Sequence, residues 1–525
     1  MIKNNRRIVL QLFFVFIIFT LMLLLPSCKN YYRNSTHKDV SISSIEKGEA
    51  LAKIYCQSCH VLPDPSMLDT KTWEKGVLPE RGPRLGIFNF GFEIYPTVKD
   101  KNLSSDFYPS LSVMSLNDWQ NILDYFVATS PNSLPAQKRK HEIKTGLSLF
   151  KAEIPALNYA NPATCFVKIN PSGSLHPIVI SDAIRQNLYF INKKFQIADS
   201  VIDSGPVVDI DFTKNNLITC NIGVLNPNNG KFGKGELIVF DSKGKFQKEP
   251  TSPFDSLQRP VQITSIDLTN DKKEDYVICE FGYLTGALSW MEGSGNNNFK
   301  RHVLRNAPGA IKVYIQDMNH DGLPDIWALF SQGEEGIFLF KNKGNGNFDT
   351  EEVLRFPPSY GSSYFEFADF NKDGYPDIVY TCGDNADYSP VLKPYHGVYI
   401  FINDKTNHFN QKYFFPINGC YKAIARDYDG DGDLDIAAIS FFADYARQPE
   451  EGFVYLKNNG NFDFQPYSIT EANMGRWLTM DAGDFDGDGK TDIILGNFSI
   501  GPAMMKHEAD WKHSPPFIIL KNINK

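Results

Sequence analysis

A nine-residue phrase that recurs along the second half of the chain constrains the fold more than any other feature. Its clearest copy is DFNKDGYPD, from Asp369 to Asp377, and further intact copies begin at Asp317, Asp427 and Asp484. A degenerate copy, DLTNDKKED, begins at Asp267. Oxygen-bearing side chains at positions 1, 3, 5 and 9, with glycine at position 6 for a sharp turn, suit a hard cation. Each copy leads into an apolar, β-branched stretch, so the phrase predicts a loop followed by a strand.

The strands that follow these loops are regularly spaced and predict a repeating unit. They open at Asp275, Asp325, Asp377, Asp435 and Asp492, at intervals of 50, 52, 58 and 57 residues. Two earlier stretches, NLITCNIG from Asn216 and GSLHPIVIS around His176, parallel the same strand and bring the count to seven units. Each unit also holds an apolar strand and a Gly/Asn-rich turn typical of hairpins, such as GIFLFKNKGNGNF from Gly336. Two hairpins in each unit predict a four-stranded blade.

The phrase and the N-x-G-N-F turn together resemble the FG-GAP or VCBS repeats of integrin-α-like β-propellers, over residues 147–525. The resemblance implies a mostly β chain whose seven-bladed propeller occupies residues 145–525. The last unit ends at its third strand. Propellers commonly take such a missing strand from the start of the domain, which places it near Leu147 to Ile154.

The same resemblance implies calcium in the loop between the first two strands of a blade. Its side-chain ligands would be Asp317, Asn319, Asp321 and Asp325; Asp369, Asn371, Asp373 and Asp377; Asp427, Asp429, Asp431 and Asp435; and Asp484, Asp486, Asp488 and Asp492. Full occupancy is not expected at the degenerate loop, where Thr269 and Lys272 replace an Asp or Asn and the Gly. The alternative is a set of ordinary Asp-rich turns. Carboxylates converging without a cation would repel, which favours structural calcium.

The start of the chain predicts export. Basic residues precede an apolar run from Ile8 to Leu25 that ends in LPSC. This ending resembles a bacterial lipobox, which implies a signal peptide at residues 1–27, a lipidated Cys28 and a tether over residues 28–42. The alternative is an uncleaved transmembrane anchor. Either arrangement places the rest of the chain outside the cytoplasm, facing the periplasm or the cell surface.

The sequence CQSCH, from Cys56 to His60, predicts heme attachment. The thiols of Cys56 and Cys59 can take both heme vinyl groups as thioethers, and the adjacent His60 is then placed to coordinate the iron. The alternatives are a thioredoxin-like redox pair and half a zinc site. The sequence has neither the βαβ pattern of the first nor the second CxxC of the other.

Residues 43–135 resemble a small, all-α, c-type cytochrome domain. Helices are expected from Ser43 to Tyr55 and from Leu116 to Ala128, each opened by a capping box, Ser43 with Glu46 and Ser115 with Asp118.

The sixth iron ligand is expected to be a methionine. Met67 lies too near His60 in sequence to reach the other heme face, so Met114 is the candidate, with a core residue as the alternative. In similar domains the methionine lies in a VLPxMG-type loop, whereas this chain has VLPERG with Arg81 at that place. A vacant sixth position, with Arg81 facing a heme propionate, is a further alternative.

The loops on the face opposite the calcium loops lengthen towards the C-terminus and predict a binding surface. They carry aromatic and basic residues suited to a glycan, a peptide or a docking protein: Tyr388, Tyr395, Tyr445, Arg447, Arg476, Trp477, His507 and Trp511. The alternative is that these loops pack on one another.

A formal charge of −8 gives no indication of a nucleic-acid partner, and no catalytic residues are identified. The sequence therefore predicts an exported, lipid-anchored c-type cytochrome that passes single electrons to a redox protein, with the propeller as a docking platform. The membrane contact would be the lipid anchor only. Two alternatives are an oxidoreductase that oxidises a sugar or alcohol on the propeller, and a glycan-binding or adhesion lipoprotein.

Overall fold

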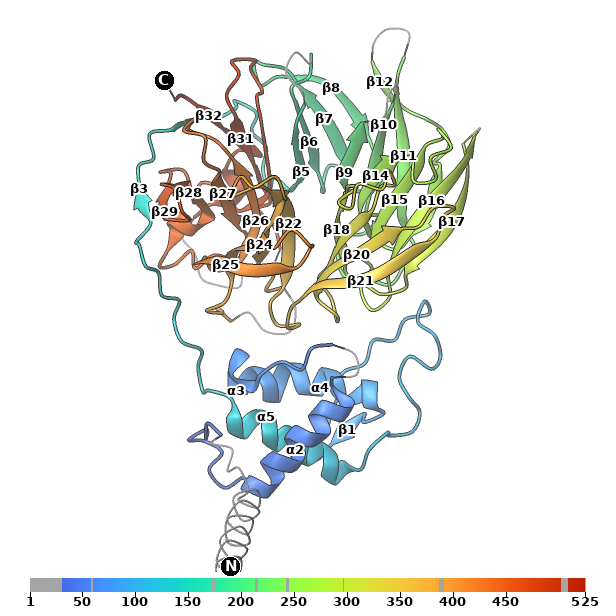
Figure 1. Ribbon diagram of the computed structural model, residues 1–525, viewed down its shortest axis with the longest axis vertical. Helices are drawn as coiled ribbons and strands as arrows, with labels where there is room; N and C mark the ends of the chain where they lie inside the picture. Colours follow the sequence, from blue (N-terminus) through green and yellow to red (C-terminus); the bar gives the residue numbers. More distant parts are fainter. Residues whose placement is uncertain are drawn as a thin grey trace, which may run out of the picture.

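The computed structural model describes residues 31–57, 60–170, 175–212, 216–241, 245–295, 297–386, 391–501 and 509–524. A small helical domain lies against one face of a large β-propeller (Figure 1). Residues 1–27, Cys28 and Cys59 lie outside the described residues, so the signal peptide and lipid anchor remain predictions. Within the described parts of the chain, no helix is long and apolar enough to cross a membrane.

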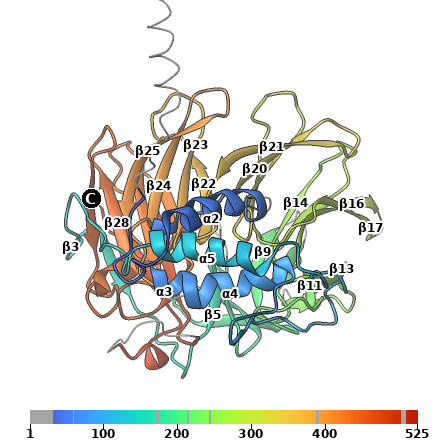
Figure 2. The same ribbon diagram turned by 90° about the horizontal axis from the view of Figure 1, so that it is seen from below.

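Two helices, α2 (Ile42–Tyr55) and α5 (Leu116–Thr129), form the centre of the helical domain and lie side by side in Figure 2. They approach closely because Gly48 has no side chain, and a Cβ there would lie 1.9 Å from the Asn121 carbonyl oxygen. Shorter elements complete the domain: η1 (Pro65–Met67), α3 (Thr70–Thr72), the π-helical turn η2 (Trp73–Val77), α4 (Leu78–Arg81), η3 (Gly82–Leu85) and the paired strands β1 (Asn89–Phe90) and β2 (Glu93–Ile94).

Of the two predicted helix caps, one is confirmed and one is wrong. The Ser115 cap is confirmed, since its hydroxyl accepts from the Asp118 backbone N–H at 3.1 Å. The Ser43 cap is wrong, because α2 begins two residues earlier than that cap requires. Ser41 is the N-cap, with extended backbone, and its hydroxyl accepts from the Ser44 N–H at 3.1 Å.

Part of the predicted tether also packs on this domain. Asn34 is fully buried, and its side chain donates to the Ser130 carbonyl at 2.9 Å. Its backbone N–H donates to the Ala128 carbonyl at 2.8 Å. These bonds satisfy carbonyl groups at the C-terminal end of α5, where a helix leaves such groups unpaired.

The propeller has seven blades, as the sequence predicts, and the chain is mostly β. The first three blades are β5 (Thr164–Ile169), β6 (Ile178–Asp182), β7 (Asn187–Ile191) and β8 (Ile197–Ile202); β9 (Val207–Phe212), β10 (Leu217–Asn221), β11 (Gly233–Phe240) and β12 (Phe246–Lys248), with β13 (Phe254–Leu257) also on β11; and β14 (Pro260–Ile266), β15 (Asp275–Glu280), β16 (Ala287–Gly295) and β17 (Asn298–Arg305). Within a blade, successive strands pair antiparallel.

The next two blades are β18 (Ala310–Ile315), β19 (Ile326–Phe330), β20 (Gly336–Asn342) and β21 (Phe348–Arg355); and β22 (Ser362–Ala368), β23 (Asp377–Cys382), β24 (Gly397–Asn403) and β25 (Phe409–Pro416). The sixth blade is β26 (Cys420–Arg426), β27 (Asp435–Ser440), β28 (Phe453–Asn458) and β29 (Phe464–Ser468), with the linker strand β3 (Lys144–Thr145) added in parallel. The seventh is β30 (Trp477–Gly483), β31 (Asp492–Asn497), β32 (Phe517–Asn522) and β4 (Phe150–Glu153). The 3₁₀ turns η4 (Pro449–Gly452) and η5 (Trp511–His513) lie in loops of these last two blades.

The seventh blade closes the ring with a strand from the start of the domain. β4 pairs antiparallel with β32, with Phe150 opposite Asn522, which confirms the segment expected from the sequence. The Phe150 ring is buried, and its centroid lies 5.8 Å from that of Tyr428 and 5.9 Å from that of Tyr455. The ring is therefore held by apolar packing as well as by backbone pairing.

Side chains of the innermost strands link neighbouring blades. The Asp209 carboxylate of β9 accepts from the Ile263 N–H of β14 at 3.2 Å. The Asp481 carboxylate of β30 accepts from the Ile169 N–H of β5 at 2.8 Å. Among the described strands, the first strand of each blade has one edge without a strand partner, and these carboxylates satisfy donors on that edge.

Candidate functional site

The helical domain covers the propeller face that carries the loops between second and third strands and the connections between blades, here called the loop face (Figure 1). The Tyr395 hydroxyl donates to the Met67 carbonyl at 3.1 Å, and the Ser359 hydroxyl lies 3.6 Å from the Met67 sulfur. Asn229 donates to Asp100 at 3.0 Å. The predicted binding surface is thus occupied, at least in part, by a domain of the same chain.

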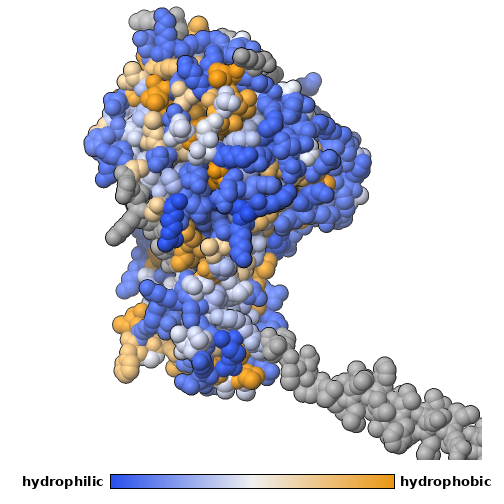
Figure 3. All heavy atoms as spheres, turned by 90° about the vertical axis from the view of Figure 1, so that its left-hand side faces the viewer, coloured by the Kyte–Doolittle hydropathy of each residue, from blue (hydrophilic) through white to orange (hydrophobic). Residues whose placement is uncertain are grey.

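Apolar contact and a fixed linker accompany these hydrogen bonds. Val391 of the loop face packs against the apolar core of the helical domain. Figure 3 shows a mainly polar propeller surface, with apolar residues at the waist between the two domains. In the linker, Gln137 donates to the carbonyls of Lys393 at 3.1 Å and His396 at 2.9 Å, and Arg139 forms an ion pair with the buried Glu451.

The predicted heme ligand, His60, lies at this boundary. Its Nδ1 is 2.9 Å from the Val61 carbonyl oxygen, and donation to that oxygen leaves Nε2 with its lone pair. Burial lowers the pKa of His60, the Val61 hydrogen bond opposes the shift, and the charges of Arg81 and Arg355 lower the pKa further. The imidazole is therefore neutral near pH 7, the form that coordinates iron.

The other residues expected at a heme lie around the same part of the helical domain. Cys56 is partly exposed and lies at the C-cap of α2. Met114 is buried in the apolar core that Cys56 borders, whereas Met67 faces the propeller. The half-buried Arg81 ends α4 and is close enough to His60 to lower its pKa. A neutral histidine beside an accessible thiol fits covalent heme.

An ion-pair cluster of the third and fourth blades faces His60 across the boundary. Glu334, in the β19–β20 loop, pairs with Arg305 and with Arg355, whose Nη2 lies 3.4 Å from Glu334 Oε1. Glu334 also acts on the His60 pKa, raising it. This cluster was not predicted from the sequence, although a signal was present: Val-Leu-Arg recurs, and both arginines are the last residue of a fourth strand.

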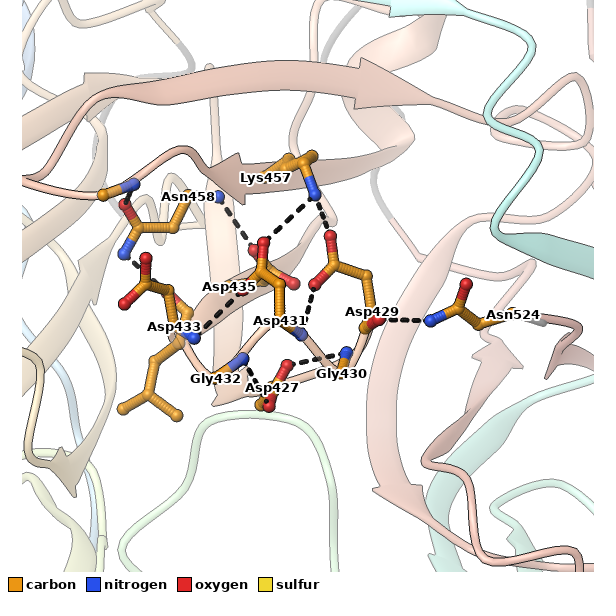
Figure 4. Close-up of polar contacts among 12 residues, drawn as sticks. Asp427, Asp429, Gly430, Asp431, Gly432, Asp433, Asp435, Lys457, Asn458 and Asn524 are labelled. Atoms are coloured by element: carbon orange, nitrogen blue, oxygen red, sulfur yellow. Dashed lines mark hydrogen bonds and ion pairs between the residues drawn. The ribbon is translucent and has the colours of Figure 1, made fainter.

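The four intact Asp-rich loops share one backbone geometry. In each, the first carboxylate accepts from the backbone N–H of the glycine at position 6, for example from Gly432 to Asp427 at 3.0 Å (Figure 4). Gly432 has φ +91°, which favours glycine. The equivalent pairs are Gly322 with Asp317 at 2.9 Å, Gly374 with Asp369 at 2.9 Å and Gly489 with Asp484 at 3.0 Å.

Carboxylates converge most clearly in the last two of these loops. One carboxylate oxygen from each of three residues lies within 4.8 Å of the others in two sets: Asp427, Asp429 and Asp435, and Asp484, Asp486 and Asp492. Burial, with added repulsion from neighbouring carboxylates, raises the pKa of Asp435 to about 6 and that of Asp492 to about 7. The arrangement suits a divalent cation with oxygen ligands.

Lysines on third strands contact the same carboxylates. Lys457 of β28 pairs with Asp429 and lies 3.3 Å from Asp431 (Figure 4). Lys521 of β32 pairs with Asp486 in the same manner. These ammonium groups offset part of the negative charge.

In the loops that begin at Asp317 and Asp369, polar side chains accept hydrogen bonds from the backbone of the same loop. Asn319 and Asn371 accept from the N–H groups of Asp321 and Asp373, at 2.9 Å and 3.1 Å. The position-9 residues Asp325 and Asp377 are buried, as in the later loops. In the degenerate loop, Asp267 still accepts from the Lys272 N–H at 2.8 Å, and the Lys273 ammonium lies 2.6 Å from Asp271.

An asparagine that was not predicted from the sequence holds each intact loop. It ends the third strand of the blade, and its backbone N–H donates to the position-9 carboxylate, for example from Asn458 to Asp435 at 2.8 Å. Its side chain donates to the carbonyl at position 8, here Leu434 at 3.1 Å. The equivalent residues are Asn342, Asn403 and Asn522. The repeated Lys-Asn or Ile-Asn at the strand end was the available signal.

The remaining aromatic and basic residues of the loop face mainly pack on one another. The Arg476 guanidinium is buried 3.7 Å from the Phe441 ring centroid. Trp511 is buried and donates to the Asn473 carbonyl at 3.0 Å, and its ring lies 4.7 Å from that of Tyr445.

Three further residues of the predicted binding surface lie in the core, in the solvent or against the helical domain, and two lie outside the described residues. Trp477 belongs to the core and donates to the Ala472 carbonyl at 2.7 Å. The Arg447 side chain is exposed, with an ion pair to Asp444 at 3.7 Å. Tyr395 contacts the helical domain, as described above. Tyr388 and His507 lie outside the described residues.

The fold and its loops define an FG-GAP-repeat β-propeller joined to a helical domain. The FG-GAP-like repeat family matches residues 317–380 and 427–495, which contain all four intact loops. Among curated proteins, cartilage acidic protein 1 of Mus musculus is 30% identical over 180 residues, covering 32% of this chain and 26% of that protein. Its counterpart in Xenopus tropicalis is 30% identical over 179 residues, with the same coverage. The aligned part thus spans about a quarter of these relatives.

Among solved structures, the Saccharomyces cerevisiae Sqt1 structure covers 70% of this chain and 98% of its own, at 7% identity and a TM-score of 0.43. At this score the likeness carries no information about function.

Proposed function

We propose that the chain is an exported, lipid-anchored c-type cytochrome that exchanges single electrons with a redox protein. Cys56 and Cys59 would bind heme c through thioethers, and His60 would be an axial iron ligand. The observation that carries the proposal is the 2.9 Å contact of His60 Nδ1 with the Val61 carbonyl oxygen, which leaves Nε2 to bind iron, in a histidine that directly follows a CxxC pair at the end of a helix.

Heme would supply a reversible one-electron couple, and the protein groups set its surroundings. The Val61 carbonyl fixes the tautomer and orientation of His60 through the 2.9 Å contact to Nδ1. The apolar core of the helical domain, including Met114 and Trp119, limits the access of water. A methionine from this core as second axial ligand would raise the reduction potential.

Calcium is proposed as a structural ion of the propeller, held by the carboxylates and asparagines of the four intact loops. Support comes from the converging carboxylate oxygens at Asp427 and Asp484 and from the buried position-9 carboxylates. The ion would fix each loop between the first two strands of a blade. No chemical step is assigned to it.

The propeller is proposed as a docking platform whose loop face holds the helical domain. The contacts of Tyr395, Ser359 and Asn229 support this role. A redox protein would then approach the helical domain from a side that the propeller does not cover. A glycan or peptide would compete with the helical domain for the loop face.

Heme attachment can be tested by expressing the chain with a cytochrome c maturation system. The denatured protein should carry the added mass of one heme and give the absorption of a heme with two thioether links. Cys56→Ser should lose one thioether link. Cys220→Ser, which alters a buried free thiol of the propeller, is the control and should keep both links. A wild-type chain without covalent heme would refute the proposal.

Electron transfer and location need separate measurements. Rapid exchange with a small redox protein, and no reduction by sugars or alcohols, would support a carrier over an oxidoreductase. Cys28→Ala should move the protein from the membrane fraction to the soluble exported fraction. Retention of that variant in the membrane fraction would point to the uncleaved anchor instead.

A further inference from the structure

The fourth blade presents charged groups to the heme-binding segment. Arg355 ends β21, and four residues later Ser359 contacts Met67 of the helical domain. Glu334, in the second-to-third-strand loop of the same blade, pairs with Arg355. The propeller thus borders the region where the heme would lie.

Arg355 has an unused donor at this boundary. Its Nε is buried and has no hydrogen-bond partner among the described residues, although its two terminal nitrogens pair with Glu334 and Glu352. A buried N–H without an acceptor costs free energy, so such a donor indicates a missing acceptor. The Glu352 side chain is half exposed, so water screens its charge.

The position of Arg355 is held by its neighbours. Glu334 is shared with Arg305, whose guanidinium lies 3.8 Å from the Phe338 ring centroid. Two guanidinium groups therefore share one carboxylate on the loop face. These contacts fix the orientation of the planar Arg355 guanidinium group. Its Nε–H remains able to donate to a further anion.

We propose that the propeller completes the heme site, with Arg355, positioned by Glu334, pairing with a heme propionate carboxylate. This inference rests on the proposed heme attachment. Arg81, the last residue of α4, offers a second guanidinium from the helical domain. The propeller would then set the reduction potential of the heme as well as hold its domain.

The test is an equilibrium redox titration of the heme-loaded full chain and its variants. Arg355→Gln removes a positive charge near the iron, which favours the oxidised heme. At a fixed potential, the ratio of reduced to oxidised heme should fall about tenfold, or about 59 mV in midpoint potential. Glu334→Gln removes the opposing charge and should raise the potential. Lys341→Gln, which breaks the 2.5 Å pair with Glu351 in the same blade, is the control and should cause no shift.

A spectroscopic measurement distinguishes direct pairing from a distant field. The propionate bending modes of the resonance Raman spectrum should shift in Arg355→Gln and partly recover in Arg355→Lys. Unchanged modes would overturn the pairing. If the midpoint potentials of Arg355→Gln and Glu334→Gln both equal that of the control variant Lys341→Gln, the whole inference is overturned.

The failures of the two proposals are distinguishable. Absence of covalent heme in the wild type would refute the proposed function, whereas heme with an unresponsive potential refutes only the role of Arg355. If Arg355→Gln does not fold, Glu334→Gln decides, because it retains Arg355 and predicts a shift of opposite sign. A Glu334→Gln protein without that positive shift would then overturn the inference.

Discussion

Asn458 offers a direct test of how the Asp-rich loops keep their shape. It ends β28 and is 4% exposed. Its side chain donates to the Leu434 carbonyl at 3.1 Å and accepts from the Gly460 N–H at 3.0 Å. We predict that Asn458→Ala destabilises the propeller even without calcium, because both backbone groups lose their partner.

The size of the effect follows from these two bonds. Each lost hydrogen bond costs about 1 kcal/mol, and a buried group left without a partner costs about 1–3 kcal/mol. Leu434 and Gly460 are only partly buried, so water recovers some of this cost. The expected loss in the free energy of unfolding is therefore about 2–4 kcal/mol. A calcium ion that depends on the loop should also bind more weakly.

The assay is urea unfolding in a chelator and again in calcium. The midpoint of Asn458→Ala in chelator should be about 1 M lower than that of the wild type. Asn459→Ala, at the exposed neighbouring position, should change the free energy by less than about 0.5 kcal/mol. Equal midpoints for the two variants would refute the role of Asn458. Equal stabilisation of both by calcium would show that the loop does not depend on this asparagine to bind the ion.

Further predictions concern ring closure, metal, heme and pH. Phe150→Ala should cost about 3–5 kcal/mol in urea unfolding, whereas Ile202→Ala, 74% exposed on β8, should cost less than about 0.5 kcal/mol. Chelation should lower the melting temperature of the propeller and calcium should restore it, by about 2.7 kcal/mol per site at a hundredfold excess over Kd; an unchanged melt would exclude structural calcium. Met114→Ala should abolish the methionine–iron charge-transfer band of the oxidised heme, and a surviving band would reassign the ligand. Burial lowers the pKa of Lys422 to about 8, and the unfolded lysine keeps its proton to about pH 10.4. Its contribution to stability should therefore rise with pH between these values, and Lys422→Met should flatten that rise.

Much of the propeller could be predicted because its signals repeat. The Asp-rich phrase fixes the register of four loops, and the spacing of strand starts from Asp275 to Asp492 gives the blade count. The closing strand at Phe150 followed from the incomplete last unit. Because the pattern repeats, a strand or loop assigned in one unit can be checked against the equivalent positions of the other units.

Single local signals were less decisive. Ser43 with Glu46 matches a capping box, yet the helix begins from Ser41. Both serines can accept from the first turn, and local sequence does not distinguish them. Helix packing decides, with the Ser44 hydroxyl donating to Asn121 of α5 at 2.7 Å.

The contact between the domains could not be predicted from the sequence. Met67 meets Tyr395 and Ser359, which lie in non-repeating loops of another domain. No periodic pattern links such positions, and a tyrosine hydroxyl in a long loop suits an outside ligand as well as an internal contact. For the Glu334 cluster, the recurring Val-Leu-Arg marks the two arginines, but no repeat marks Glu334 as their partner.

The pairing of β4 with β32 has a consequence for the order of folding. Phe150 and Asn522 lie at opposite ends of the propeller sequence, yet they are neighbours in one blade. During synthesis, β4 must wait for nearly all of the other strands before it can pair, and loop-closure entropy makes such a late contact slow. His60 precedes β4 in the chain, so under the proposed function its segment is synthesised, and open to heme attachment, before the propeller ring can close. The pairing of β4 with β32, which closes the ring, would then follow the attachment of heme.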